Sequence, residues 1–479
     1  MSTAPGWWSA LGRERARPAR LREWRHAGWL AVGTVCFGAF MGQLDASIVT
    51  LTYQPLRTQF HVSLAEVQWV SLAYLLALAA LLIPVGRLAD AHGRKLTYLY
   101  GFVVFTAASA ACGLAPSLSV LVACRVLQAL GAAMLQANSV ALVTTSAPAN
   151  RMRAALGVQA AAQALGLALG PTVGGLLVET LGWRWVFWIN VPIGVLAVLG
   201  GIYLLPRTRE RSGAGGRDLP GALLLATAST SLLLGISGVS GLPLPRWASV
   251  GLLAVAALAS VGFVLRLRWA ATPLIDLALL RNRDVAAGLL GALGGYLVLF
   301  GPLVLVPVTF GDAGRSQLQA GFVLTALPAG FALAATVGDR LLPRHWTERT
   351  RAILGAGLSV LALAGLLTAP PATDWLIAPL ALLGLALGLF TPANNTLIMA
   401  TVPGPAAATG GGLVNMARSL GTALGVAVVA LALSVAAGRH GPPDGPTLTV
   451  LVLAATSVVT LCSAWAQHDH SAERAVSSD

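Results

Sequence analysis

Asp45 stands out because it is the only one of the 18 acidic residues that lies well inside a long apolar stretch. A carboxylate at the centre of a membrane helix costs about 2.5–3.5 kcal/mol on insertion scales, so such an acid usually has a function. Burial in hydrocarbon disfavours the ionised form, which is the property that a proton carrier needs. The alternative is that Asp45 only holds a neighbouring helix through a hydrogen bond.

Arg125 is a second charge inside an apolar stretch, and it needs a partner or a water-filled cavity there. Counted from the predicted outer ends of their helices, Arg125 is about seven residues deep and Asp45 about ten, a similar depth at about 1.5 Å per residue. We therefore predict that the two side chains form a proton-coupling pair. The alternative is that the long side chain of Arg125 reaches the outer surface.

A third pattern places small residues at helical spacing in the stretch 154–178. Small residues let two helices approach backbone to backbone, and a proline inside a helix removes one hydrogen bond and bends it. Such a contact can seal one side of a membrane protein in one state and open in another, although simple helix contact is the alternative. The residues are Gly166, Gly170, Pro171, Gly174 and Gly175.

Further polar residues lie in central apolar stretches and could line a cavity, or each could hydrogen-bond a neighbouring helix. The aromatic cluster at 183–192 could be no more than a belt at the membrane interface. The candidate cavity residues are Tyr74, Gln128, Gln159, Gln163, Asn394, Asn395, Asn415 and Arg418.

The segment 86–95 places three cations and one carboxylate between two long apolar stretches. Such a segment cannot lie in hydrocarbon, so we predict an exposed turn between two membrane helices, on the cytoplasmic side because of its Lys and Arg. The alternative is that the turn only sets the topology. Its candidate gating residues are Gly86, Asp90, Gly93, Arg94 and Lys95.

The composition indicates an all-helical integral membrane protein. Of the 479 residues, 56% are hydrophobic and only 10% are charged, whereas a soluble protein has about 25% charged residues. Apolar runs of about twenty residues predict helices and not a barrel. The net charge of +13 is spread over short loops, which favours membrane orientation and not nucleic acid as its cause. Four cysteines (Cys36, Cys112, Cys124 and Cys462) lie in apolar stretches without paired spacing, so no disulfide, metal or cofactor is expected.

Fourteen membrane spans are predicted after a basic N-terminal segment, residues 1–26, in which no signal peptide is expected. The spans are about 27–52, 64–85, 96–115, 119–146, 154–178, 184–205, 218–240, 247–268, 285–310, 319–338, 352–369, 374–399, 408–436 and 447–467.

The distribution of Lys and Arg supports this count. Segments assigned to the cytoplasm carry 24 of the 31 cations, and those assigned outside carry five. We therefore expect both termini in the cytoplasm of a multi-pass protein in the cell membrane.

An internal repeat divides the chain. The sequence at 162–170, AQALGLALG, is echoed at 417–425 by ARSLGTALG. Two six-helix bundles, 27–206 and 285–467, fit this repeat if 207–284 is a linker with an extra two-helix hairpin and 468–479 is a cytoplasmic tail. Parallel repeats of this kind place one site at the midplane between two moving bundles.

Several of these segments resemble the motifs of the major facilitator superfamily. They are GRLADAHGRK at 86–95, LDASIV at 44–49, Arg125 with Gln128, Gly131 and Ala132, and GLALGPTVGG at 166–175, which resembles the antiporter motif. The extra central hairpin is similar to that of the fourteen-helix drug:proton antiporter branch. The chain departs from the family at Ala91, Thr50, Pro55 and Ala129.

This resemblance implies the major facilitator fold and a proton-driven exporter of amphipathic or lipophilic organic compounds such as drugs, antibiotics or dyes. The expected partners are a small molecule, protons and the lipid bilayer, and the expected state is a monomer. A dedicated exporter of one metabolite is an alternative, and so is a receptor or an enzyme on the same fold. An enzyme would need a cluster of His, Cys and acids at membrane depth, which the sequence does not contain.

Overall fold

The computed structural model describes residues 17–18, 24, 26–147, 151–207, 218–239, 244–270, 277–343, 346–370, 372–402, 407–437 and 444–468. The described chain is helical and contains no strand, which confirms the predicted fold class. Most of the predicted N-terminal segment and C-terminal tail lies outside the described residues.

The first half of the chain forms six membrane-spanning units, some of which consist of two consecutive helices. They are α3 (Ala27–Ile48) continued by η1 (Val49–Thr52) and α4 (Tyr53–Phe60), α5 (Leu64–Val67) with α6 (Trp69–His92), α7 (Arg94–Gly113), α8 (Leu118–Ser146), α9 (Met152–Thr180), and α10 (Arg184–Trp188) with α11 (Asn190–Leu204). We call this set the N-terminal half.

The second half follows a helical hairpin. The hairpin consists of α12 (Leu219–Val239) and α13 (Arg246–Trp269), and a short α14 (Leu277–Arg281) precedes the next span. The C-terminal half consists of α15 (Arg283–Asp312), α16 (Gln317–Leu341), α17 (Glu348–Thr368), η3 (Asp374–Leu376) leading into α18 (Ile377–Thr401), α19 (Ala407–Ala437) and α20 (Gly445–Ala466).

Thirteen helical units in the described residues are long and apolar enough to cross a membrane. The apolar part of α12, Leu223–Gly238, is shorter. Together these helices occupy the places of the fourteen predicted spans, so the protein is a multi-pass membrane protein.

The first span is longer than predicted. The helical path that begins at Ala27 continues through the 3-10 turn η1 into α4 and ends only at Phe60, eight residues beyond the predicted end at 52. Pro55 does not stop it because this residue lies in the first turn of α4, where a helix does not need the missing N–H.

The predicted loop at 86–95 is almost entirely helical, which corrects the expectation of an exposed ten-residue turn. Helix α6 continues through Gly86 to His92, and only Gly93, whose φ is 111°, separates it from α7. Arg94 starts α7. The side chain of Asp90 lies outside the described part of the structure.

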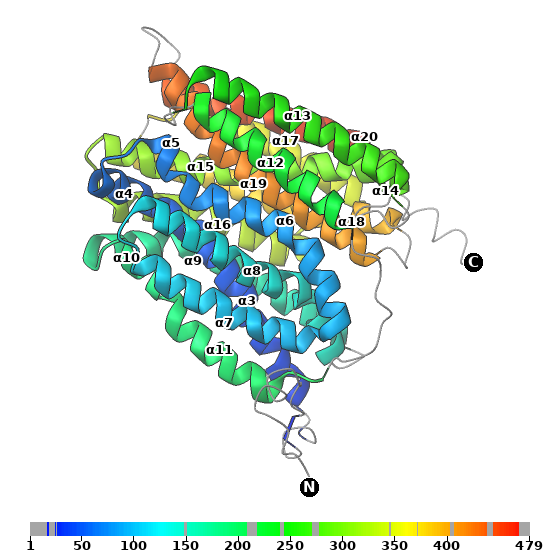
Figure 1. The fold of residues 1–479 in the computed structure, drawn as a ribbon. Helices are drawn as coiled ribbons and strands as arrows, with labels where there is room; N and C mark the ends of the chain where they lie inside the picture. Colours follow the sequence, from blue (N-terminus) through cyan, green and yellow to red (C-terminus); the bar gives the residue numbers. More distant parts are fainter. Residues whose placement is uncertain are drawn as a thin grey trace.

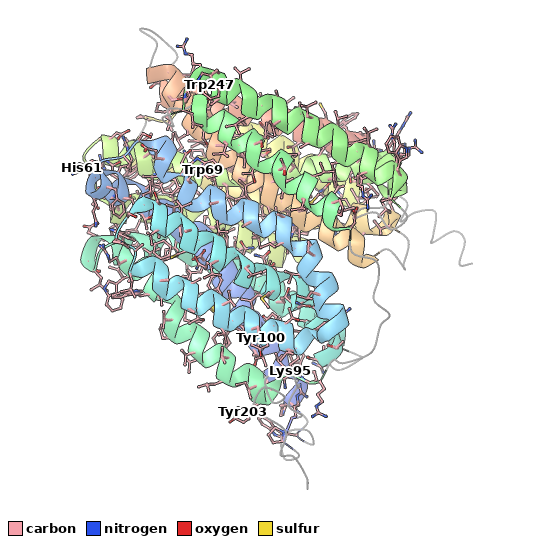
Figure 2. All side chains as sticks on the ribbon, viewed as in Figure 1. His61, Trp69, Lys95, Tyr100, Tyr203 and Trp247 are labelled. Carbon is pink, nitrogen blue, oxygen red and sulfur yellow. The ribbon has the colours of Figure 1, made fainter. Side chains whose placement is uncertain are left out.

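Lys95 is also not an exposed loop cation. Its ammonium group is fully buried and donates to the carbonyl oxygens of Ile202, at 3.0 Å, and Leu205, at 2.7 Å. Ile202 lies in the last turn of α11 and Leu205 directly follows that helix, where a cation is favourable because the helix dipole is negative there. Lys95 therefore joins α7 to the end of α11. Figure 2 shows Lys95 and Tyr203 near one end of the molecule, with His61 and Trp69 at the opposite end.

The helices form two halves that meet mainly through two pairs of helices. Helix α3 packs against α9, and α15 against α19, while the main contacts between the halves are α9 with α16 and α6 with α19. The hairpin α12–α13 (green in Figure 1) touches α6 in one half and α19 in the other, so it covers the line where those two helices meet.

The internal repeat is visible in these helix contacts. A Cβ atom added at Gly166 in α9 would meet the backbone of Phe40 in α3, and one added at Gly421 in α19 would meet the backbone of Leu293 in α15. Gly425 likewise lies against Leu297. In both halves, therefore, small residues of the fifth span let it contact the first span at backbone distance.

Candidate functional site

Asp45 in α3 and Arg125 in α8 form a buried ion pair within the N-terminal half. Arg125 Nη1 lies 2.6 Å from Asp45 Oδ2, and the two residues are 1% and 0% exposed. Arg125 Nε also donates to the carbonyl oxygen of Val70 in α6, at 2.9 Å. The guanidinium group thus stays inside the bundle and does not reach the outer surface. The pair satisfies the requirement that a buried charge has a charged or hydrogen-bonding partner.

Two amides complete the first layer of partners around Asp45. Gln128 donates from Nε2 to Asp45 Oδ1 at 2.9 Å, and Asn190 in α11 donates to the same oxygen at 3.3 Å. Gln128 Oε1 accepts from Arg125 Nη1 at 2.6 Å, and its Nε2 also donates to Ser109 in α7 at 2.6 Å. Asp45 therefore accepts hydrogen bonds from three donors on two other helices, Arg125 and Gln128 on α8 and Asn190 on α11.

Sequence analysis missed Asn190 and Ser109 as members of this network. The available signal for Asn190 was a polar residue just before Val191 and Pro192 inside an apolar span. Its position among Trp and Phe residues favoured an interface belt instead. Ser109 had no such signal because a serine can satisfy its hydroxyl on its own helix.

Aromatic rings close the network on two sides. The guanidinium carbon of Arg125 lies 4.1 Å from the ring centroid of Tyr74 and 5.8 Å from that of Phe187. Tyr74 is buried, and its hydroxyl has no hydrogen-bond partner within the described ranges of the chain. The rings offer the cation favourable cation–π contacts while limiting access of water to it.

A polar cavity lies between the two halves, on the other side of Tyr74. The N-terminal half contributes Gln43, Tyr74, Gln136 and Gln163, among others, and the C-terminal half contributes residues of α15 and α19. A smaller pocket beside it is lined by both Tyr74 and Arg125. Tyr74 thus separates the ion pair from the cavity. The residues of α15 and α19 that line the cavity are Tyr296, Phe300, Asn415, Arg418, Ser419 and Thr422.

Four of the predicted cavity residues line this space: Tyr74, Gln163, Asn415 and Arg418. Gln128 does not, because its amide is used by the ion-pair network. Asn394 does not either, because it donates to the carbonyl oxygen of Gly288 at 2.9 Å and accepts from Gln467 at 2.8 Å, which ties three helices together. Gln159 and Asn395 are also not among the described residues that surround the cavity.

The glycines of α9 divide between two neighbouring helices. Gly166, Gly170 and Gly174 face α3, where an added Cβ at Gly170 would collide with Ser47. Gly175 faces α16 in the other half, where an added Cβ would lie 2.7 Å from the carbonyl oxygen of Gln317. The motif therefore serves two contacts, one within its own half and one between the halves.

Polar contacts surround the junction of α9 and α16. Pro171 and Gly321 meet at backbone distance, and the hydroxyls of Thr172 and Thr325 are hydrogen-bonded. Glu179 accepts from the backbone N–H of Leu318 at 3.1 Å. This junction lies at the end of the bundle that the charge distribution assigns to the outside.

An exposed ion pair also joins the two halves at this end of the bundle. Arg57 at the end of the first span lies 3.5 Å from Asp312 at the end of α15. Because both side chains are partly in water, this pair is worth only about 0–1 kcal/mol. The close backbone contact between α9 and α16 therefore accounts for more of the closure than the ion pair does.

Comparison with known proteins places residues 35–426 under the family model described as Major Facilitator Superfamily. The chain is 32% identical to the riboflavin transporter RibZ of Clostridioides difficile, over 83% of this chain and 87% of that protein. It is also 32% identical to the tetracenomycin C resistance and export protein of Streptomyces glaucescens, over 86% of this chain and 77% of that protein. The multidrug resistance protein Stp of Mycobacterium tuberculosis is 32% identical, over 83% and 74% of the two chains.

Proposed function

The chain belongs to the Major Facilitator Superfamily, and on that premise we propose that it is a proton-coupled antiporter that exports amphipathic or lipophilic organic compounds across the cytoplasmic membrane. That it is a membrane transporter and not an enzyme follows from the family and from relatives that are themselves named as transporters. The direction of transport, the proton and the substrate class are the content of the proposal.

The buried pair of Asp45 and Arg125 is the observation that carries the proposal. Among the described residues of the N-terminal half, Asp45 is the only acid that forms a fully buried ion pair with a cation. Phe40 in α3 and Leu293 in α15 make equivalent contacts, with Gly166 and Gly421 respectively. Asp45 lies five residues after Phe40, and the residue five positions after Leu293 is Val298, which has no charge. The proton-binding group of the proposal therefore belongs to one half alone.

Protonation of Asp45 removes its negative charge and weakens the attraction to Arg125. The carboxylate then stops holding α8 and α11 to α3 through charge-assisted hydrogen bonds, which are about twice as strong as neutral ones. The helices of the N-terminal half are thereby released to rearrange. A proton shifts the protein between outward-facing and inward-facing states only if it binds one state better than the other.

The closed junction of α9 with α16 supports an alternating-access cycle. In the described arrangement the halves are in contact at the predicted outer end, and the polar cavity lies deeper between them. Export then requires the backbone contacts at Gly175 and Gly321 to separate, while contacts nearer the cytoplasmic end form. Two packed halves that move as units around one cavity provide this behaviour.

Export of one endogenous compound is the second candidate. It is favoured by relatives whose names specify one compound, riboflavin in one and tetracenomycin C in another. The same site and the same coupling would serve either function, and only the breadth of substrates differs.

A susceptibility and accumulation screen tests the proposal. Cells that produce the protein are compared with cells that produce Gly170→Val, over a panel of antibiotics and fluorescent dyes. The added side chain at residue 170 would collide with Ser47 and displace the helix that carries Asp45. Lower accumulation of several unrelated compounds in the first cells supports a multidrug exporter, and an effect on one compound alone supports the dedicated exporter. Equal accumulation of every compound contradicts export.

A further inference from the structure

Arg418 is the one charged residue among those that line the central cavity. It lies in α19, the fifth span of the C-terminal half. Its guanidinium carbon is 5.2 Å from the ring centroid of Tyr296, and its buried Nε atom has no hydrogen-bond partner in the part of the chain that the structure describes. Among the described residues, no carboxylate forms an ion pair with it.

None of the described residues that line the cavity carries a negative charge that could balance Arg418. Asp45 does not balance this charge, because it is fully buried behind Tyr74 and both of its oxygens accept hydrogen bonds from other residues. Its charge is compensated by Arg125. The ion pair thus contributes no net charge, and the cavity is positive because of Arg418.

The internal repeat shows that this cation is not required for the helix contact. The echo of 162–170 at 417–425 aligns Gln163 with Arg418, and both residues line the same cavity from opposite halves. Gly166 and Gly421, three residues further along each helix, make equivalent contacts with the first span of their own half. A neutral amide at position 163 is therefore compatible with the same contact, and the positive charge of residue 418 is a feature of the cavity.

An unpaired cation at membrane depth is unfavourable unless water or a ligand compensates it. An anion that enters the cavity would gain charge-assisted hydrogen bonds from the guanidinium group. The aromatic rings of Tyr74, Tyr296 and Phe300 line the same space and favour a flat aromatic ligand. The amides of Gln136, Gln163 and Asn415 add donors for carbonyl or hydroxyl groups.

From this arrangement we infer that the cavity selects aromatic compounds that carry an acidic group, such as a carboxylate or a phenolate, over cationic compounds of similar size. This inference rests on the proposed export function and names the substrate class of its site. The anion would be held by α19 in the C-terminal half and the proton by α3 in the N-terminal half. The two would then be linked through the conformation of the protein, without sharing one binding group.

The test is equilibrium binding of two xanthene dyes to the purified full-length protein at constant pH, measured by fluorescence anisotropy. Fluorescein is anionic, and rhodamine 123 is a cationic methyl ester with a similar ring system. Wild type is expected to bind fluorescein about tenfold more tightly than rhodamine 123, as expected for one partly screened charge pair. Arg418→Gln should weaken fluorescein binding by about the same factor, whereas Arg418→Lys, which keeps the charge, should retain most of it.

Arg246→Gln is the matched control, because Arg246 is an exposed residue at the start of α13, outside the cavity. It removes the same charge and should leave both dissociation constants unchanged. Gln163→Arg should have the opposite effect to Arg418→Gln. It places a second cation in the cavity and should tighten fluorescein binding. Equal binding of fluorescein by wild type and Arg418→Gln, tighter binding of rhodamine 123 by wild type, or no measurable binding of fluorescein would each overturn the inference.

The result is separable from that of the proposed function. If fluorescein binding depends on Arg418 but a pH gradient drives no transport, the coupling proposal fails and the substrate inference stands. If a pH gradient drives export of rhodamine 123 while fluorescein does not bind, the coupling proposal stands and the substrate inference fails.

Discussion

Arg125 makes three hydrogen bonds at once, to Asp45, to Gln128 and to the backbone of Val70. Each acceptor comes from a different position in the N-terminal half, so the guanidinium group holds α3, α6 and α8 together. Asp45 and Arg125 are both fully buried, so water cannot take the place of a missing partner. The contribution of either charged partner to stability therefore depends on the presence of the other.

We predict a strongly non-additive effect of substitutions at this pair. Arg125→Gln alone should lower the free energy of unfolding by about 3–5 kcal/mol, because it leaves a buried carboxylate without its cation. The double variant Asp45→Asn with Arg125→Gln should lose less stability than Arg125→Gln alone, since it leaves no buried charge at this site. Thermal unfolding of the purified variants in detergent measures both. Effects that add independently would show that the two side chains do not interact.

The residues of this site differed in how visible they were in the sequence. Asp45 and Arg125 could be identified because a charge in an apolar stretch is costly and therefore rare. Gln128 and Asn394 were interpreted as cavity residues, yet both amides are used in hydrogen bonds between helices. An amide can satisfy its hydrogen bonds in many surroundings, so its presence in a helix does not reveal which neighbour it contacts.

At the scale of elements, α9 is in contact with both halves. Three of its glycines approach α3, whereas Gly175 approaches α16. The spacing of small residues predicted close helix contacts, but it could not show which helix lies on which side. That assignment depends on how the two halves are placed, which is a property of long-range contacts.

Gly175→Val should weaken the junction with α16 while leaving the protein folded. The added side chain would overlap the backbone of Gln317 and Leu318, and backbone cannot move away as a flexible side chain can. Cysteines introduced at Thr172 and Thr325, whose hydroxyls are in contact, report the closure through disulfide formation in a background without the four native cysteines. The expected result is a lower cross-linking yield.

Gly157→Val on the same helix is the control, because no neighbouring atom of the described residues lies within 4 Å of a Cβ added at Gly157. It should cross-link like the parent protein. An unchanged yield in Gly175→Val would mean that this glycine does not support the closed junction.

Helix boundaries show the limits of sequence analysis at this scale. The charged segment at 86–95 predicted a loop, but α6 continues to His92 because Leu, Ala and Arg are good helix formers even where they leave the hydrocarbon. Lys95 was interpreted as an exposed loop cation, and it is buried against the end of α11. Composition places a segment relative to the membrane, whereas the start and end of a helix depend on local caps and neighbours.

For the molecule as a whole, the periodic apolar runs and the distribution of cations were sufficient to predict an all-helical membrane fold. The repeat of 162–170 at 417–425 also indicated two related halves, and the equivalent contacts of Gly166 and Gly421 agree with it. The position of the hairpin α12–α13 could not be predicted, because both helices are apolar on most of their surface. Its contacts with α6 and α19 emerge only from the assembled bundle.

The orientation of the whole molecule is predicted by the charge distribution. Reporter fusions after residues 212, 275 and 345 should behave as cytoplasmic, and a fusion after residue 243 should behave as external. The reason is the excess of Lys and Arg in the segments assigned to the cytoplasm, 24 against five outside. A cytoplasmic signal from the fusion at 243 would mean that α12 and α13 do not each cross the membrane.

Coupling of export to protons through Asp45 is the central claim. It involves the whole molecule because Asp45 belongs to the N-terminal half, whereas the cavity is lined by both halves. The direct measurement is pH-gradient-driven dye transport in vesicles reconstituted with wild type, Asp45→Asn or Asp45→Glu. Asp45→Asn keeps the size of the side chain but cannot exchange a proton. We predict that it still binds the dye and no longer responds to the gradient, while Asp45→Glu retains part of the response. Undiminished gradient-driven transport by Asp45→Asn would contradict the account.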